Sequence, residues 1–169
     1  RAQLEIGVDG VIGGTDICYN VGPLISPSSF REFVAPYLKK IVDECHKFEV
    51  PYIKHLDGNV MPLLDILVHE IGIDGLHSIE PPAGMNIAEV KSKYGDRLTL
   101  LGNLDCAGSI TEDSQERVIE EVKDILRKAS PGGGHVFTSS NCIHSGVNYR
   151  SFLTMVDSVK KYGVYPISI

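Results

Sequence analysis

The chain has 169 residues, of which 43% are hydrophobic and 22% are charged, and its net charge is −6 at pH 7. This length and composition suit one domain with a hydrophobic core, which we expect to span residues 1–169. A negative chain without a Lys/Arg-rich block does not fit nucleic acid or an anionic membrane surface as its main partner. No apolar stretch has the length of a membrane span, and the sequence shows no signal peptide.

The cysteines indicate the cellular compartment. None forms a CxxC pair, and all four are widely spaced: Cys18, Cys45, Cys106 and Cys142. Because this spacing is a poor framework for disulfides, we expect a reducing environment and a cytoplasmic location.

Along the chain, five short apolar runs alternate with helical patterns. Each run ends in a polar residue and a turn that contains glycine or proline, and the runs are Val8–Gly14, Val50–Lys54, Gly75–Ile79, Leu98–Gly102 and His135–Ser140. The runs are mostly apolar on both faces, which is typical of a parallel sheet covered by helices. Their recurrence at intervals of roughly 30 residues predicts right-handed βαβ units.

Caps and hydrophobic spacing predict the helices between these strands. Ser26-Pro27 begins the first helix, and Pro36 predicts a kink or an early break within it. Asp113 and Glu116 resemble a capping box at the start of a later helix. Three further helices are predicted from periodicity, over about Val60–Ile71, Ile87–Tyr94 and Asn148–Tyr162.

The start of the chain suggests that a barrel is incomplete. The sequence opens at Arg1 rather than Met, and residues 1–7 resemble the end of a helix that enters a loop. A closed barrel needs eight βα units, whereas five are predicted here. We therefore expect an N-terminal part to be missing.

Polar residues follow the C-terminal end of each predicted strand. In a parallel α/β sheet these ends lie on one rim, where chemistry is placed. We therefore expect the following residues to converge on one site: Asp16, His55, Asp57, Glu80, Asn103, Asp105, Asn141 and Cys142.

His55 and Asp57 form the most suggestive pair at this rim. Residues two apart in a strand point the same way, so both side chains can face one pocket. Imidazole and carboxylate together suit a zinc ion, or a histidine that a carboxylate orients. The alternative is that Asp57-Gly58-Asn59 is a turn in which Asp57 caps the next helix, and spacing alone favours this turn.

The other rim residues each have two interpretations. A Cys142 thiolate would be a soft third ligand for zinc, whereas the alternative is a buried, inert cysteine. Asp16 is a candidate general acid or base, or a group that binds a polar substrate atom, but it could equally cap the loop that follows. Glu80 and Asn103 carry the same ambiguity between substrate binding and structural support.

Four stretches of the chain resemble the uroporphyrinogen decarboxylase superfamily: Gly22–Phe33, Val50–Gly58, Leu100–Asp105 and Tyr162–Pro166. They fall in order and span almost the whole chain. The resemblance implies an α/β fold, namely the C-terminal portion of a (β/α)8 TIM barrel with about five βα units.

This superfamily has two main chemistries. Decarboxylases act on a tetrapyrrole without a cofactor, whereas cobalamin-dependent methyltransferases use zinc, held by a His-x-Cys pair and a later Cys, to activate a thiol. His55 matches the methyltransferase histidine, and Asp57 stands where the first cysteine is expected. Asp57-Gly58 also resembles the decarboxylase loop. Asn141 or Cys142 falls at the position of the second cysteine or of the decarboxylase histidine, and Asp16 lies where decarboxylases place a serine that contacts substrate.

The first function that the resemblance implies is methyl transfer between a corrinoid protein and a small substrate. Asp16, His55 and Asp57 would be catalytic, and His55, Asp57 and Cys142 would hold a zinc-type metal. The expected substrate-binding residues are Asp16, Glu80, Asn103 and Asn141. The corrinoid would come from a partner protein, because Ile53 stands where the cobalamin motif D-x-H-x-x-G requires aspartate.

Two alternatives stay open. One is cofactor-free decarboxylation of a tetrapyrrole in porphyrin biosynthesis. The other is an inactive barrel segment that pairs with its missing N-terminal half or with a second copy. An open sheet exposes its edge strands, so a homodimer would bury the edges of Val8–Ile12 and His135–Ser139.

Overall fold

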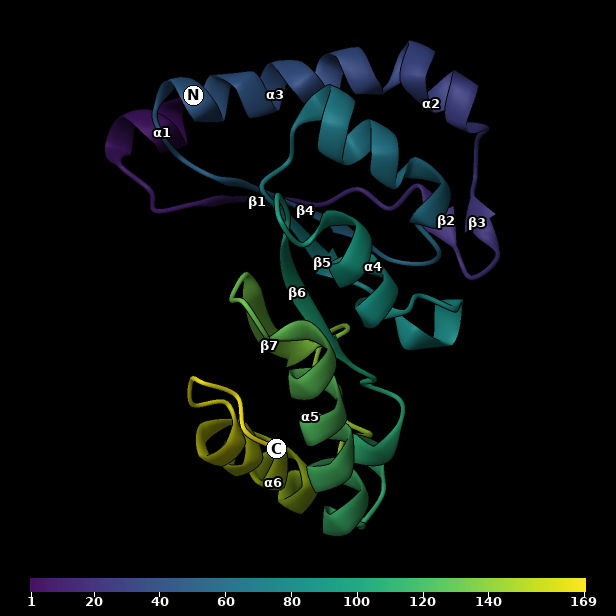
Figure 1. The fold of residues 1–169 in the computed structure, drawn as a ribbon. Helices are drawn as coiled ribbons and strands as arrows, with labels where there is room; N and C mark the ends of the chain where they lie inside the picture. The colour runs from purple at the N-terminus through teal and green to yellow at the C-terminus, as the bar shows by residue number, and fades with distance from the viewer.

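The computed structural model describes residues 1–169 and is built around one parallel sheet (Figure 1). Its five strands lie in the order β1 (Val11–Gly13), β4 (Tyr52–Leu56), β5 (Gly75–Ser78), β6 (Thr99–Leu104) and β7 (His135–Ser139). All neighbouring strands are parallel, and their order in the sheet follows their order in the chain. The predicted parallel α/β architecture is confirmed: β1, β5 and β7 lie within their apolar runs, and β4 and β6 begin within theirs and extend two residues beyond them.

A small hairpin is the one pair of strands that the sequence pattern did not predict. It consists of β2 (Cys18–Tyr19) and β3 (Gly22–Pro23), which pair antiparallel. Each strand has only two residues, which is too short for a periodic pattern. The hairpin lies between β1 and the first long helix and packs on the loop after β4, where Asn59 N donates to Tyr19 O.

The helices are distributed along the whole sheet, from its first strand to its last (Figure 1). The α-helices are α1 (Ala2–Ile6), α2 (Pro27–Phe33), α3 (Ala35–Lys47), α4 (Ile87–Tyr94), α5 (Gln115–Ala129) and α6 (Tyr149–Tyr162). A helical segment between β4 and β5 begins as a 3₁₀ turn, η1 (Met61–Leu63), and ends as a π-helix, η2 (Ile66–Ile71). Two further 3₁₀ turns are η3 (Pro81–Ala83) and η4 (Ser109–Thr111).

Caps and proline explain most helix boundaries. Ser26 caps α2 by accepting a hydrogen bond from Ser29 N, and the predicted break occurs where α2 ends and α3 begins, just before Pro36. The predicted capping box at α5 is wrong. Ser114 is the N-cap there and its side chain makes no capping bond, while the Asp113 carboxylate accepts from Gln115 instead.

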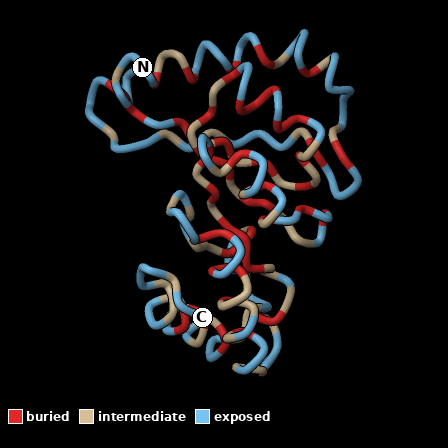
Figure 2. Tube along the Cα trace, in the orientation of Figure 1, coloured by how far each residue is buried: buried red, intermediate tan, exposed pale blue.

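The buried side chains form two separate clusters. The larger contains 27 buried residues, mostly from β4, β5, the start of β6 and the helices from α2 to α4, including Phe30, Leu56 and Leu76. The smaller contains seven buried residues from the end of β6, η4, α5 and α6, including Leu104 and Val122. Figure 2 shows buried residues concentrated in the sheet and on the helix sides that face it. Each fully buried Leu, Ile or Val contributes about 1.5–3 kcal/mol, so the larger cluster supplies most of the hydrophobic stabilisation.

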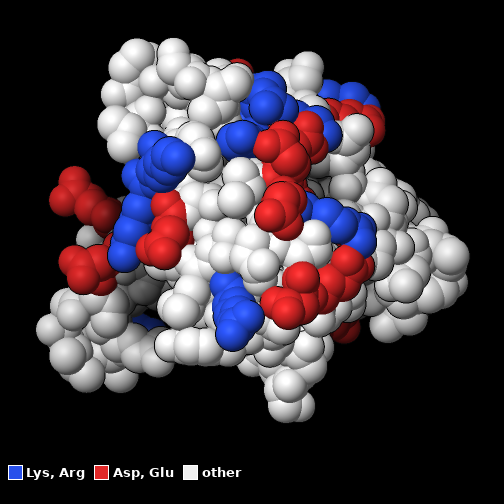
Figure 3. Space-filling model, turned by 90° about the horizontal axis from the view of Figure 1, so that it is seen from below, with Lys and Arg blue, Asp and Glu red and all other residues white.

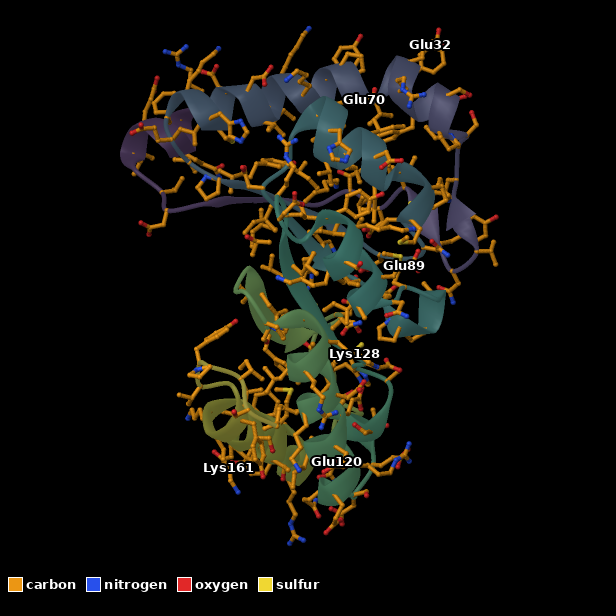
Figure 4. All side chains as sticks on the ribbon, viewed as in Figure 1. Glu32, Glu70, Glu89, Glu120, Lys128 and Lys161 are labelled. Carbon is orange, nitrogen blue, oxygen red and sulfur yellow. The ribbon has the colours of Figure 1, made fainter.

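Charges are mixed over the surface. Lys and Arg lie beside Asp and Glu on the face seen from the side of α5 and α6 (Figure 3), and labelled side chains such as Glu32, Glu70 and Glu89 lie on the outer helices (Figure 4). No helix combines the length and the apolar character needed to cross a membrane. The two outer strands of the sheet, β1 and β7, each carry an apolar side chain that is exposed to solvent. Ile12 is 65% exposed and Val136 is 49% exposed.

Candidate functional site

Three of the predicted residues meet at the C-terminal ends of β1 and β4. Asp16 follows β1, His55 lies in β4, and Asp57 comes directly after β4. One ligand atom of each residue lies within 4.8 Å of the others. His55 Nε2 is 3.6 Å from Asp57 Oδ1 and 3.9 Å from Asp16 Oδ1. We call Asp16, His55 and Asp57 the rim cluster.

Asp57 is held by side chains from two other segments, the neighbouring strand β5 and the loop after β7, rather than by its own turn. Its Oδ1 accepts a hydrogen bond from Ser78 Oγ at 3.1 Å, and its Oδ2 accepts from Asn141 Nδ2 at 2.8 Å. The interpretation of Asp57 as a cap of the next helix is wrong, because the N-cap of η1 is Val60 and the side chain that accepts from the first N–H of this turn is Asn59, from Met61 N at 3.2 Å. The carboxylate therefore keeps a fixed position beside His55.

The loop after Asp57 is shaped by Gly58 and Glu80. Gly58 has a φ of +83°, and a Cβ at this position would lie 2.7 Å from the backbone nitrogen of Tyr19 in the hairpin. Only glycine fits both the left-handed backbone and the close approach. Gly58 N donates to Glu80 Oε2 at 2.7 Å, so Glu80 supports the loop that carries Asp57.

Lys54 ties the loop that carries Asp16 to β4. Its Nζ donates to Gly13 O and Thr15 O, both at 3.3 Å, and to His55 O at 2.9 Å. The side chain is 4% exposed, and this burial lowers the pKa of Lys54 although the nearby Asp16 carboxylate raises it. Asp16 also accepts from Asp57 N at 3.2 Å. Sequence reasoning missed Lys54, although a lysine in an otherwise apolar run was a usable signal.

His77 is a second residue that sequence reasoning missed. The register of β4 and β5 places His77 directly beside His55, and their Nδ1 atoms are 2.7 Å apart. His77 Nε2 lies 3.3 Å from Ser139 O at the end of β7. Burial lowers the pKa of His77, and the neighbouring His55 lowers it further. A polar residue inside an apolar strand was again the available signal.

The remaining predicted residues lie outside the rim cluster. Asn103 is buried in β6, where its Nδ2 donates to Ile79 O at 3.1 Å, and it lines a separate cleft of about 390 Å³ between α4 and α5. Cys142 is exposed in the loop after β7, and its backbone N–H donates to Asn141 Oδ1 at 2.7 Å. Asp105 accepts from Ala107 N at 2.9 Å, as expected for a turn. The rim thus brings together Asp16, His55 and Asp57, with Asn141 and Glu80 as supports.

The chain has clear relatives. The family model described as Uroporphyrinogen decarboxylase (URO-D) matches residues 1–162. The uroporphyrinogen decarboxylase of Thioalkalivibrio sulfidiphilus is 32% identical over 168 residues, covering 97% of this chain and 45% of the relative. That of Pseudoalteromonas atlantica is 28% identical over 168 residues, covering 96% and 44%. The chain therefore spans less than half the length of these curated relatives.

A solved structure shows the fold to which the sheet belongs. The methyltransferase from Methanosarcina mazei matches with a TM-score of 0.74 at 23% sequence identity, covering 96% of this chain and 45% of that chain. The five parallel strands, in chain order and covered by helices, are thus a contiguous part of a (β/α)8 barrel. The expected partial barrel is confirmed.

Proposed function

The chain belongs to the uroporphyrinogen decarboxylase family, and from this premise we propose that it takes part in methyl transfer between a corrinoid protein and a small substrate. In this proposal the rim cluster holds a zinc-type metal. The observation that carries it is the approach of one imidazole nitrogen and two carboxylate oxygens to within 4.8 Å of one another.

The chemistry of these donors fits zinc. Zinc accepts histidine nitrogen and carboxylate oxygen, and three protein ligands leave a fourth position for a substrate. Asp57 also has the outer hydrogen bonds that orient a ligand, from Ser78 and Asn141. The proposed ligands are therefore Asp16, His55 and Asp57. Cys142, which the sequence suggested as the third ligand, lies outside this group.

Each residue has a defined task in this proposal. A bound zinc ion would lower the pKa of a thiol substrate and so favour the nucleophilic thiolate. His55 and the two carboxylates fix the position where that thiol binds. Lys54 holds the backbone just before Asp16, and Glu80 holds the loop after Asp57, so the binding geometry is set by the ends of the strands.

The test is the zinc content of the purified, untagged chain, measured by mass spectrometry and by calorimetric titration. We expect near-stoichiometric zinc in the unmodified protein. His55→Ala and Asp57→Ala should weaken binding by more than the roughly 10–100-fold that loss of an outer hydrogen-bond partner costs. His69→Ala, which removes an exposed histidine of η2, is the matched control and should bind normally.

The remaining outcomes are equally decisive. Retention of zinc in Cys142→Ser would confirm a site without the thiolate, whereas its loss would restore Cys142 as a ligand. Absence of zinc from the unmodified chain would overturn the metal site.

A second candidate is decarboxylation of a tetrapyrrole, which the names of the curated relatives favour. The many carboxylates of such a substrate call for arginines near the site. Three arginines of this chain are engaged elsewhere: Arg31 pairs with Glu70, Arg117 with Glu112, and Arg127 binds the carbonyl of Ile169. Release of carbon dioxide from a tetrapyrrole, unaffected by zinc chelation, would favour this candidate.

The open sheet supports a proposal about partners. Ile12 on β1 and Val136 on β7 are exposed on the two outer strands, which also have unpaired backbone groups. We propose that these edges pair with a second copy of the chain. Sedimentation should then show a dimer that Ile12→Lys dissociates, and a monomer at all concentrations would contradict this proposal.

A further inference from the structure

His55 and His77 make a direct hydrogen bond. Their ring centroids are 4.9 Å apart with the rings tilted by 32°, and the Nδ1 atoms approach to 2.7 Å. This separation is that of a hydrogen bond, so one Nδ1 must carry a proton and the other must accept it.

The far side of the His77 ring decides which nitrogen donates. His77 Nε2 lies 3.3 Å from Ser139 O, and a carbonyl oxygen can only accept. In a neutral His77 ring the proton therefore sits on Nε2, and Nδ1 carries a lone pair. His55 must then donate from its own Nδ1, which leaves the lone pair of His55 on Nε2.

The His55 lone pair faces the two carboxylates of the rim cluster. His55 Nε2 lies 3.6 Å and 3.9 Å from the nearest oxygens of Asp57 and Asp16, which is too far for a good N–H···O hydrogen bond. Three electron-rich atoms that face one another without a shared proton suit a cation placed among them.

We propose that His77 is a positioning residue that fixes the tautomer of His55, so that the Nε2 lone pair of His55 is available to a divalent cation held with Asp16 and Asp57. The consequence for metal binding rests on the proposed function, whereas the tautomer itself does not. A chain of hydrogen bonds thus runs from Ser139 on β7 through His77 on β5 to His55 on β4.

The first test reads the tautomer directly in the metal-free protein. Long-range proton–nitrogen correlation spectra distinguish protonated from unprotonated ring nitrogens, and His55→Gln identifies the His55 signals among the six histidines. We expect a protonated Nδ1 and an unprotonated Nε2 on His55 at neutral pH. A proton on His55 Nε2 would overturn the inference.

The second test uses a matched pair of variants at one position. His77→Asn retains an acceptor near the place of Nδ1, whereas His77→Leu has similar bulk and no acceptor. We expect His77→Leu to weaken zinc binding roughly 10–100-fold and His77→Asn to bind much as the unmodified protein does. Equal weakening in both variants, with thermal unfolding unchanged, would contradict the positioning role.

The two tests separate this inference from the proposed function. If the unmodified chain binds no zinc, the metal site fails, but the tautomer still decides the role of His77. If zinc binds and the tautomer is the opposite one, the metal site stands and the inference about His77 is wrong.

Discussion

The molecule has two regions that differ in how well they are packed, and the candidate site draws on both. The large-core region comprises β1, β4, β5 and the helices that cover them, with the cluster of 27 buried residues. The small-core region comprises β7, α5 and α6, with the cluster of seven, and β6 joins the two. All three residues of the rim cluster come from the large-core region.

The small-core region supplies groups that orient this cluster. Asn141 donates to Asp57, and the carbonyl of Ser139 accepts from His77. Candidate ligands thus stand on the well-packed strands, while the alignment of two of them depends on a more weakly packed neighbour. Loss of packing in the small-core region should therefore impair the site before the large-core region unfolds.

The largest expected effect is the loss of stability when a buried leucine is truncated, which should differ between the two cores. Leu76 on β5 and Leu104 on β6 are both fully buried, in the large and the small cluster respectively. We expect Leu76→Ala to cost about 4 kcal/mol and Leu104→Ala about 2–3 kcal/mol, because the smaller cluster can collapse more easily around the lost volume. Urea unfolding followed by circular dichroism measures both, and equal losses would remove the distinction between the regions.

The next effect concerns two glycines with similar backbone conformation. Gly58 has a φ of +83° and no room for a Cβ, whereas Gly132, before β7, has a φ of +79° and no neighbour within 4 Å. The left-handed conformation alone should make Gly132→Ala cost about 1–2 kcal/mol. Gly58→Ala should cost about 2 kcal/mol more, because its Cβ meets the backbone of Tyr19. Thermal unfolding of the two variants tests the difference.

A smaller effect tests the contribution of the small-core region to metal binding. Asn141→Ala removes the donor to Asp57 Oδ2 and should weaken zinc binding about tenfold in calorimetric titration. Asn20→Ala, at an exposed position in the hairpin, serves as the control and should leave affinity unchanged. Unchanged affinity in Asn141→Ala would mean that Asp57 is oriented by Ser78 alone.

The smallest effect is a pH dependence of stability within the small-core region. His135 Nε2 donates to Gly102 O at 2.8 Å, and burial lowers the pKa of His135. The unfolded chain, with a histidine pKa of about 6.5, therefore binds this proton more readily than the folded protein. The contribution of neutral His135 is complete above about pH 6.5 and is lost as the pH falls through the lower folded pKa.

The variant His135→Gln tests this contribution. Urea midpoints measured between pH 7.5 and pH 5 should fall less steeply in the variant than in the unmodified protein. A fall of the same slope in both proteins would assign the pH dependence to other groups.

The sheet could be predicted well from the sequence, because strands and helix breaks are marked by residues that are close together in the chain. Apolar runs and the proline at position 36 mark strands and a helix break without knowledge of distant contacts, and the convergence of Asp16, His55 and Asp57 follows from the rule that strand ends share a rim. The hairpin was missed because strands of two residues have no period. Sequence periodicity also does not determine where a side chain points once a strand has ended, so the outward position of Cys142 could not be predicted.

The contacts that orient the site lie beyond local information. Asn141 and Asp57 are 84 positions apart, and their hydrogen bond exists only once β7 is in place. Lys54 and His77 were overlooked because the sequence alone does not show what a polar side chain inside an apolar strand contacts. Lys54 binds backbone carbonyls of the loop before Asp16, and His77 contacts His55 and the carbonyl of Ser139, so these contacts depend on strand pairing that no local motif reveals.

The register of β4 and β5 has a consequence for which sequence changes the family can tolerate. His55 stands opposite His77 only because the short connection after η2 has a set length, and Asp74 in that connection fastens it by accepting from Tyr52 N at 2.7 Å. Loss or gain of one residue there would turn Leu76 or Ser78 toward His55, or reverse the faces of β5. A connection at the opposite end of the strands from the rim should therefore resist insertions and deletions that surface loops normally accept.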